Sequence, residues 1–135
     1  MANDFKDLLD NCQTIAVVGL SDNSAKTSYI VARYMQTHGY RIIPVNPNIK
    51  ESLGEKAYPS LKDIPVKVDI VNIFRSSNDV PPLAEESITI KAKAIWMQEG
   101  IVNEPCAEKA RAAGLKVVMD RCIMVEHARL IAGLR

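Results

Sequence analysis

The chain has 135 residues, 47% of them hydrophobic and 24% charged, and a formal net charge of +1 at pH 7. These values are typical of one globular domain with its own core, expected over residues 1–135. The small net charge and the absence of a Lys/Arg run exclude the broad electrostatic attraction that nucleic acids and anionic membranes exert on basic proteins. No apolar stretch approaches the ~18 residues of a membrane-spanning helix, and the N-terminus lacks the apolar segment of a signal peptide. We therefore expect a cytoplasmic protein without a nucleic-acid or membrane partner.

Short apolar runs alternate with amphipathic stretches along the whole chain. Apolar residues at helical spacing predict helices at 4–11, 27–38, 80–91, 104–113 and 125–131. Apolar, largely β-branched runs predict strands at 14–19, 41–45, 68–74, 94–97 and 115–119, and one helical turn is expected at 60–64 in the connector 53–65. Strands that alternate with helices pair in parallel through right-handed crossovers. The expected fold class is α/β: a Rossmann-like, doubly wound, five-stranded parallel sheet with helices on both faces, in a single domain.

A few single residues have a structural interpretation. Asn103, and either Asn78 or Asp79, are expected to cap the helices that follow them. Trp96 lies within a strand that should be covered on both faces, so it is expected in the core. His127 is expected on the surface in an ion pair with its helical neighbours.

Three cysteines, Cys12, Cys106 and Cys122, lie far apart in the sequence. Their number and spacing predict neither a disulfide framework nor a CxxC metal site. The simplest interpretation is three reduced thiols in a cytoplasmic protein.

The strongest functional signal is the turn after the first strand. Gly19 ends the strand, Leu20 and Ser21 follow it, and Lys26 and Ser28 lie where the next helix begins. Backbone N–H groups and the positive end of the helix dipole meet at such a turn, which makes it suited to bind a phosphate. Lys26 adds a positive charge and Ser28 a hydroxyl. The alternative is an ordinary turn followed by a capped helix.

The same turn differs from the fingerprint of dinucleotide-binding proteins. The pattern G-x-G-x-x-G needs a second glycine where this chain has Ser21, whose Cβ prevents the same close approach of a pyrophosphate. An NAD site also expects Asp or Glu after the second strand, where this chain has Asn46 and Pro47 and no carboxylate before Glu51. These residues argue against a dinucleotide and leave NAD(P) as the alternative ligand.

Ligands of open α/β sheets bind beyond the carboxyl ends of the strands, where the strand order reverses. The residues after the later strands are mostly polar: Phe74, Arg75 and Ser76; Gln98, Glu99 and Gly100; Asp120, Arg121 and Cys122. Arg75 follows an apolar strand into the predicted cleft, where it could meet a phosphate. Asp120 and Arg121 are expected to pair and to brace the last loop, with Cys122 as a small packing residue. The alternative is a reactive Cys122 thiol.

Five segments together resemble one known family. They are GLS…KTSY (19–29), PVNP (44–47), DIVNIFR (69–75), AIWMQEG (94–100) and VMDRCIMVEH (118–127). This set, in this order, resembles the small bacterial and archaeal CoA-binding domain proteins, which are related to the N-terminal domain of the succinyl-CoA synthetase α subunit. The resemblance covers about 14–130 and implies a Rossmann-like fold that binds coenzyme A or an acyl-CoA at the carboxyl ends of the strands.

The resemblance implies CoA contacts at four strand ends. The implied phosphate contacts are Gly19, Leu20, Ser21, Lys26 and Ser28. The implied contacts along the adenosine, the adenine or the pantetheine arm are Asn46, Pro47, Phe74, Arg75, Gln98, Glu99 and Gly100. If Cys122 is reactive, it could form a mixed disulfide with the CoA thiol.

The expected function is therefore CoA binding in a carrier, sensor or regulatory role, with no residue assigned to catalysis and none to a metal. The synthetase has a further domain with a phosphohistidine and a partner subunit, so ligase activity is not expected of this domain. One alternative is an NAD(P)-binding oxidoreductase or redox sensor on the same fold. The other is a protein-interaction subunit without a ligand, and the protein partner it would have is unknown.

Overall fold

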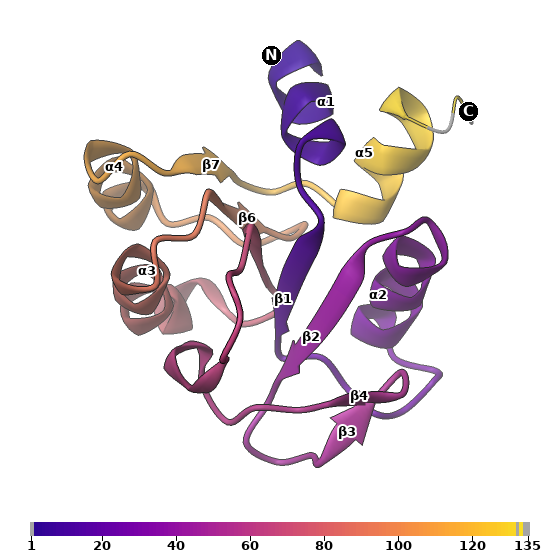
Figure 1. Cartoon of the computed structure of the whole chain (residues 1–135). Coiled ribbons are helices and arrows are strands. Elements are labelled where there is room, and N and C mark those ends of the chain that lie inside the picture. The colour runs from indigo at the N-terminus through magenta and orange to yellow at the C-terminus, as the bar shows by residue number, and fades with distance from the viewer. Residues whose placement is uncertain (1, 132, 134–135) are drawn as a thin grey trace.

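The five predicted strands form one parallel sheet in the computed structural model, which describes residues 2–131 and 133 (Figure 1). The strands are β1 (Thr14–Val18), β2 (Arg41–Val45), β5 (Ile70–Ile73), β6 (Ala94–Met97) and β7 (Lys116–Val118). Their order is β2-β1-β5-β6-β7, with Ile15 opposite both Ile42 and Ile70. This order reverses between β1 and β5, so the predicted doubly wound topology is confirmed. Residues 1, 132, 134 and 135 of the expected domain lie outside the described residues.

Helices cover both faces of the sheet, as predicted (Figure 1). Helices α1 (Ala2–Asp10), α2 (Thr27–Thr37) and α5 (Ile123–Leu130) pack together on one face, and α3 (Val80–Thr89) and α4 (Glu104–Ala112) pack together on the other. Strand side chains alternate between the two cores: Ile15 and Val17 of β1 point to the first, Ala16 and Val18 to the second. Both faces of β1, β5 and β6 are buried, which explains why these strands read as largely apolar runs.

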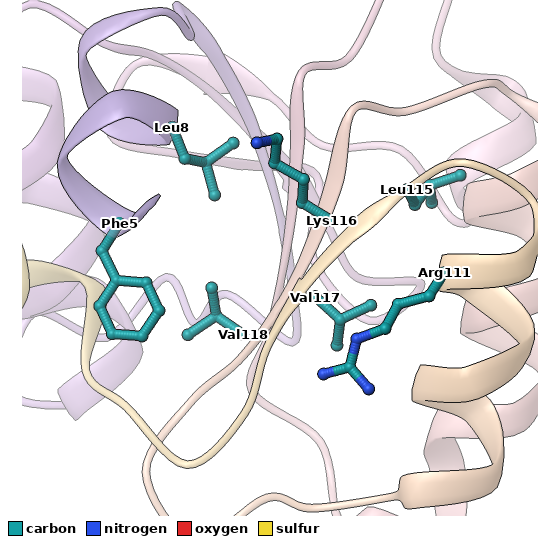
Figure 2. A pocket seen from close by; sticks show the side chains of 7 residues that line it. All are labelled: Phe5, Leu8, Arg111, Leu115, Lys116, Val117 and Val118. Carbon is teal, nitrogen blue, oxygen red and sulfur yellow. The ribbon is translucent and has the colours of Figure 1, made fainter. Parts of the chain in front are cut away.

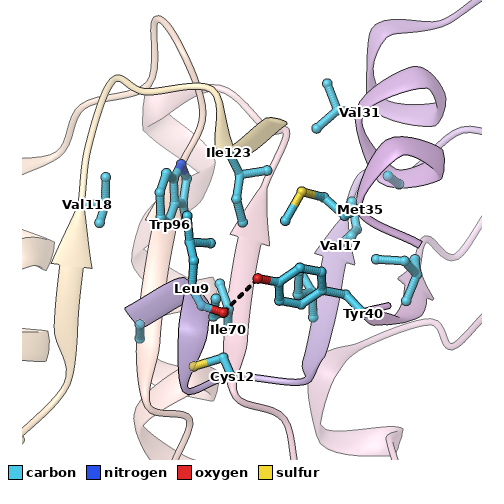
Figure 3. Close-up of a cluster of buried hydrophobic side chains, with 14 of the residues drawn as sticks. Leu9, Cys12, Val17, Val31, Met35, Tyr40, Ile70, Trp96, Val118 and Ile123 are labelled. Atoms are coloured by element: carbon cyan, nitrogen blue, oxygen red, sulfur yellow. Dashed lines mark hydrogen bonds between the residues drawn. The ribbon is translucent and has the colours of Figure 1, made fainter. Parts of the chain in front are cut away.

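The first core contains the expected buried tryptophan (Figure 3). Trp96 is fully buried, and its indole N–H donates to the Arg121 carbonyl at 2.8 Å. On the same face the Tyr40 hydroxyl donates to the Leu9 carbonyl at 2.6 Å, which ties α1 to the turn before β2. Burial raises the pKa of Tyr40 to about 12. Both aromatic side chains therefore have satisfied polar atoms inside an apolar layer.

A short hairpin after β2 is the main element that the sequence did not predict. It consists of β3 (Glu51–Ser52) and β4 (Glu55–Lys56), joined by Leu53 and Gly54, which both have positive φ. The expected helical turn is confirmed as a short 3₁₀ turn at Leu61–Asp63, and a second lies at Ser77–Asp79. Figure 1 shows the hairpin at the carboxyl end of β2, the end where a ligand is expected.

Some local predictions are wrong. Asp79 occupies the N-cap position of α3 but makes no capping hydrogen bond, because its carboxylate accepts from Ser76 and Arg75 instead. Asn103 does cap α4, accepting from the N–H of Cys106 at 3.1 Å. His127 is buried rather than on the surface, and its Nδ1 lies 3.0 Å from the Tyr34 hydroxyl.

Within the described residues, no helix has both the length and the apolar character needed to cross a bilayer.

Asp69 fastens the start of the sheet. Its Oδ2 accepts hydrogen bonds from the backbone N–H groups of Gln13 at 2.8 Å and Thr14 at 3.1 Å, and Lys93 lies 3.6 Å from Oδ1. Burial alone would raise the pKa of Asp69, but these two hydrogen bonds and Lys93 outweigh it and lower the pKa. The ionised carboxylate therefore stabilises the entry into β1.

We expect Asp69→Asn to destabilise the fold by about 2 kcal/mol at pH 7, because hydrogen bonds to a charged group are lost. A lowered pKa in the folded state gives stability that is present above the unfolded pKa and lost as the pH falls through the folded pKa. The difference in the free energy of unfolding between the variant and the parent should therefore shrink as the pH falls below about 4. Urea unfolding at several pH values measures it, with Asp10→Asn, in an exposed pair with Lys6, as the control that changes little. An equal gap at pH 7 and pH 3 would contradict this role.

Candidate functional site: the carboxyl ends of β1 and β5

Gly19 lies where the strand order reverses. It has φ of +88°, and its N–H donates to the Val45 carbonyl at 2.9 Å, while the N–H of Phe74 donates to the Val18 carbonyl at 2.9 Å. A Cβ on Gly19 would lie 2.6 Å from the Phe74 carbonyl oxygen and 3.2 Å from Cδ of Arg75. Both the positive φ and the close backbone therefore require glycine at this position.

The loop after Gly19 is folded back onto the first turn of α2. The backbone N–H of Ser21 donates to Oγ of Ser28 at 3.0 Å, and Oγ of Ser21 accepts from the N–H of Asn23 at 2.9 Å. Leu20 is 0% exposed as a whole residue, so neither its side chain nor its backbone is open to a ligand in this structure. The Oγ atoms of Ser21 and Ser28 thus accept hydrogen bonds that shape the loop, and each hydroxyl can still donate its proton to a ligand.

Neighbouring segments hold this loop in place. Asn46 Nδ2 donates to the Leu20 carbonyl at 3.0 Å, and the Ser52 hydroxyl in the hairpin donates to the Ser21 carbonyl at 2.8 Å. Gln36 of α2 also donates to the Leu53 carbonyl at 3.0 Å, so the hairpin is tied to the helix as well. The unpredicted hairpin therefore supports the loop from outside. Pro47, next to Asn46, is exposed.

The N-terminus of α2 has free donors. Lys26 is its N-cap residue in an extended conformation, and no side chain caps the helix. The backbone N–H groups of Thr27, Ser28 and Tyr29 have no acceptor within the described part of the chain. Unsatisfied N–H groups and the helix dipole favour an anion at this position, and the exposed Lys26 side chain adds a positive charge nearby.

A cavity of about 440 Å³ opens beside this helix start. Residues from the ends of β5, β6 and β7 and from the start of α2 line it: Thr27, Phe74, Arg75, Ser76, Gln98, Glu99, Ile101 and Cys122. Its size lies in the range of small-molecule sites. The cavity and the free α2 N-terminus share Thr27, so they form one continuous site.

Arg75 is the cation of this cavity. About half of its side chain is exposed, and its Nη2 lies 3.4 Å from Oδ2 of Asp79, one helical turn further along the chain. An exposed ion pair of this kind is worth little, so a phosphate can compete for the guanidinium. Cδ of Arg75 also lies against Gly19, so this side chain connects the cavity with the loop.

Gln98 forms the inner wall and joins three elements. It is 4% exposed, and its Oε1 accepts from Asn72 Nδ2 at 3.0 Å and from the N–H of Ile123 at 2.9 Å. Glu99 and Gly100 beyond it are exposed. The Gly100 N–H donates to Oδ1 of Asp120 at 2.7 Å, which holds the turns after β6 and β7 together.

The expected pair between Asp120 and Arg121 is wrong. Asp120 accepts from Gly100, and Arg121 lies 3.8 Å from the buried Glu126 and over the ring of Phe5. The last loop is still braced, but by two separate interactions.

The predicted residues thus divide into two groups. Phe74, Arg75, Gln98 and Glu99 line the cavity, whereas Gly19, Leu20, Ser21, Lys26, Ser28, Asn46, Pro47 and Gly100 form or flank the adjoining loops. The cavity also has lining residues outside the predicted set: Thr27, Ser76, Ile101 and Cys122. Thr27 could have been found from its place at the start of a helix, since that position leaves an N–H free.

A second cavity lies beside the edge strand β7 (Figure 2). It measures about 450 Å³ and is lined by Phe5, Leu8, Arg111, Leu115, Lys116, Val117 and Val118. None of the predicted site residues lines it. It lies on the far side of β6 from the point where the strand order reverses, so the general rule for open sheets does not favour it.

The fold and the site define a class: a Rossmann-like α/β domain with an anion-binding helix start at the reversal of its strand order. A sequence model described as "CoA binding domain" matches residues 13–128, and the chain belongs to this CoA-binding domain family. The resemblance seen in the sequence is thereby confirmed.

Individual relatives agree with this assignment. The chain is 48% identical over 125 residues to the uncharacterized protein YneT of Bacillus subtilis, covering 93% of each. It is 38% identical over 139 residues to the alpha subunit of acetate–CoA ligase (ADP-forming) II of Pyrococcus furiosus, covering 93% of this chain and 30% of that subunit. A hypothetical protein from Pyrococcus horikoshii has the same fold, with a TM-score of 0.94 and 38% identity over 97% of this chain and 92% of that one.

We expect Gly19→Ala to destabilise the fold by about 2–4 kcal/mol, because it adds the cost of a positive φ to a clash with the Phe74 carbonyl. Gly100→Ala is the matched control: its φ is +84°, but a Cβ there would meet nothing within 4 Å. It should cost only about 1–2 kcal/mol. Thermal and urea unfolding of both variants measure the difference. Equal losses for the two would show that the close approach at Gly19 is not a constraint.

Proposed function

We propose that this protein binds coenzyme A or an acyl-CoA across the carboxyl ends of β1 and β5. The observation that carries the proposal is the continuity between the free N-terminus of α2, the Arg75 guanidinium and the cavity that reaches Gln98. Membership of the CoA-binding domain family supports the ligand class. Nucleotide binding is thus proposed as the basic activity of the domain.

The charges fit a ligand with several phosphates. CoA carries a diphosphate and a 3′-phosphate, which need donors and positive charge, and an apolar pantetheine arm with two amides, which needs a groove. The free N–H groups of α2 and the Lys26 side chain supply donors and positive charge for the phosphates. The cavity wall at Phe74 and Gln98 supplies the groove for the pantetheine arm. Arg75 lies between them and is available to either phosphate group.

The residues after β2 support CoA over NAD(P). Asn46 stands where an NAD site uses a carboxylate, and its amide is engaged with the Leu20 carbonyl and the Asn48 N–H. The second loop glycine of a dinucleotide site is replaced by Ser21. An NAD(P)-dependent oxidoreductase or redox sensor is therefore the weaker proposal.

The role we propose is that of a carrier, sensor or regulator in acyl-CoA chemistry, in the cytoplasm, with no residue assigned to catalysis. The chain spans 11–30% of the length of the ADP-forming acetate–CoA ligases that it matches. Their reaction therefore does not transfer to this domain by similarity. A ligand-free interaction subunit is the remaining alternative, and the ligand panel below tests it.

A thermal-shift panel with CoA, acetyl-CoA, 3′-dephospho-CoA, NAD and NADP tests the ligand class. A ligand at ~100 times its Kd adds ~2.7 kcal/mol of stability, which is several degrees for a domain of this size. We expect stabilisation by CoA and acetyl-CoA, less by dephospho-CoA, and none by NAD or NADP. Stabilisation by NAD(P) alone would replace the proposal with the dinucleotide alternative, and no shift with any ligand would favour the interaction subunit.

Charge-removing variants test the site. We expect Lys26→Ala and Arg75→Ala each to raise the Kd for CoA about tenfold, or about 1.4 kcal/mol, and to reduce its dependence on salt, since each removes a partner of a phosphate. Isothermal titration calorimetry at two ionic strengths measures both effects. Lys116→Ala, which removes a cation from the cavity beside β7, is the matched control and should bind as the parent does. If Lys116→Ala weakens binding and the other two do not, the ligand occupies the other cavity.

A further inference from the structure

Cys122 is the thiol that lies at the proposed CoA site. It lines the cavity together with Phe74, Arg75 and Gln98, whereas Cys12 and Cys106 lie elsewhere in the fold. All three cysteines are free. Burial raises the pKa of Cys12 to about 11 and also raises the pKa of Cys106, which makes both thiols poor nucleophiles at neutral pH.

The backbone on both sides of Cys122 is held firmly. The Arg121 carbonyl accepts from the Trp96 indole at 2.8 Å, and the Ile123 N–H donates to Oε1 of Gln98 at 2.9 Å. Cys122 is the N-cap residue of α5, and no side chain caps that helix. Cys122 is 9% exposed and packs in the apolar core, as expected of a packing residue, and it also lines the cavity. It therefore holds a fixed position on the cavity wall, directly before a helix and not on a mobile loop.

Gln98 is an independent sign that this wall receives a ligand. The residue is only 4% exposed, and its Oε1 already accepts two hydrogen bonds. Its Nε2 donates to no acceptor in the described part of the chain. Every side-chain nitrogen or oxygen there that is completely enclosed has a hydrogen-bond partner, so Nε2 is not completely enclosed. Nε2 is therefore at least partly accessible, and the cavity that Gln98 lines is the site from which a ligand could reach it. A carbonyl oxygen, such as an amide of a pantetheine arm, would satisfy this donor.

We propose that Cys122 is a site of covalent attachment for CoA, as a mixed disulfide between Sγ and the thiol sulfur at the end of the pantetheine arm. This inference rests on the proposed function, since the arm must lie along Gln98 for its sulfur to reach Cys122. The phosphates at the start of α2 and the cavity wall at Cys122 then hold the two ends of the same ligand.

The step is a thiol–disulfide exchange with a CoA disulfide as the co-reactant. The Cys122 thiol loses its proton, and the thiolate attacks one sulfur of the CoA disulfide. The S–S bond of that disulfide breaks as the bond between Sγ and one CoA sulfur forms. The second CoA leaves as a thiolate and takes up the proton. Cys122 is oxidised, one CoA is reduced, and a free thiol reverses the reaction.

Such an adduct would make the site respond to the redox state of the CoA pool. Reduced CoA and acyl-CoA bind and leave, whereas CoA disulfide leaves one CoA attached until a thiol releases it. An acyl-CoA has no free thiol or disulfide, so it competes for the same cavity without forming the bond.

Intact-mass analysis after incubation of the reduced protein with CoA disulfide tests the inference. We expect one CoA per chain, removed by dithiothreitol, with peptide mapping to Cys122. Cys122→Ser should give no adduct and Cys106→Ser the parental amount, with both variants checked for folding by circular dichroism. Glutathione disulfide, which lacks the nucleotide, should react at least ~10-fold more slowly, and excess acetyl-CoA should suppress the CoA adduct.

The outcomes separate this inference from the proposed function. If reduced CoA binds by calorimetry but CoA disulfide leaves no adduct, Cys122 is a packing residue and the proposed function stands. An adduct on Cys12 or Cys106, or equal rates with glutathione disulfide, would also overturn the inference. If CoA does not bind the parent at all, the proposed function itself fails.

Discussion

The close approach of the chain after β1 to the end of β5 is the constraint on which the site depends. Gly19 has a positive φ and leaves no room for a side chain beside the Phe74 carbonyl. At this place the chain leaves β1 toward α2 on one face of the sheet and leaves β5 toward α3 on the other. The segments that follow the two strands therefore diverge to opposite faces of the sheet. The crevice between these two segments is where open α/β sheets bind their ligands.

The rest of the site is built outward from that crevice. Hydrogen bonds from Asn46 and Ser52 fix the carbonyl groups of the loop, and Oγ of Ser28 fixes the Ser21 N–H. The N–H groups of the first turn of α2 have no acceptor within the described residues. Gln98 fixes the wall formed by β5, β6 and the start of α5 through two hydrogen bonds. Few of these polar groups depend on a ligand for their partners, so the site is largely pre-organised, which lowers the cost of binding.

Much of this architecture could be predicted because the apolar pattern has one interpretation. Both faces of β1, β5 and β6 are covered, so continuous apolar runs marked the strands, and the ends of β2 and β6 were predicted to the residue. The family resemblance pointed to the strand ends, and four of the named residues do line one cavity.

The parts that were missed depend on contacts that the local sequence does not carry. The β3–β4 hairpin turns through Leu53 and Gly54, and Leu53 tolerates its positive φ because its side chain packs against the core. His127 is buried because α2 and α5 meet, which no pattern within α5 reveals. Likewise Asp120 faces Gly100, twenty residues earlier in the chain, and not its neighbour Arg121. In each case the neighbouring sequence allowed more than one conformation or partner, and contacts with distant parts of the chain determined which one forms.

A crystal structure of the protein with CoA tests the central claim most directly. The account predicts phosphates on the N–H groups of Thr27 and Ser28, the Arg75 guanidinium turned from Asp79 toward the ligand, and the pantetheine arm along Gln98 toward Cys122. CoA seated beside β7 against Arg111 and Lys116, with the crevice between β1 and β5 empty, would contradict it.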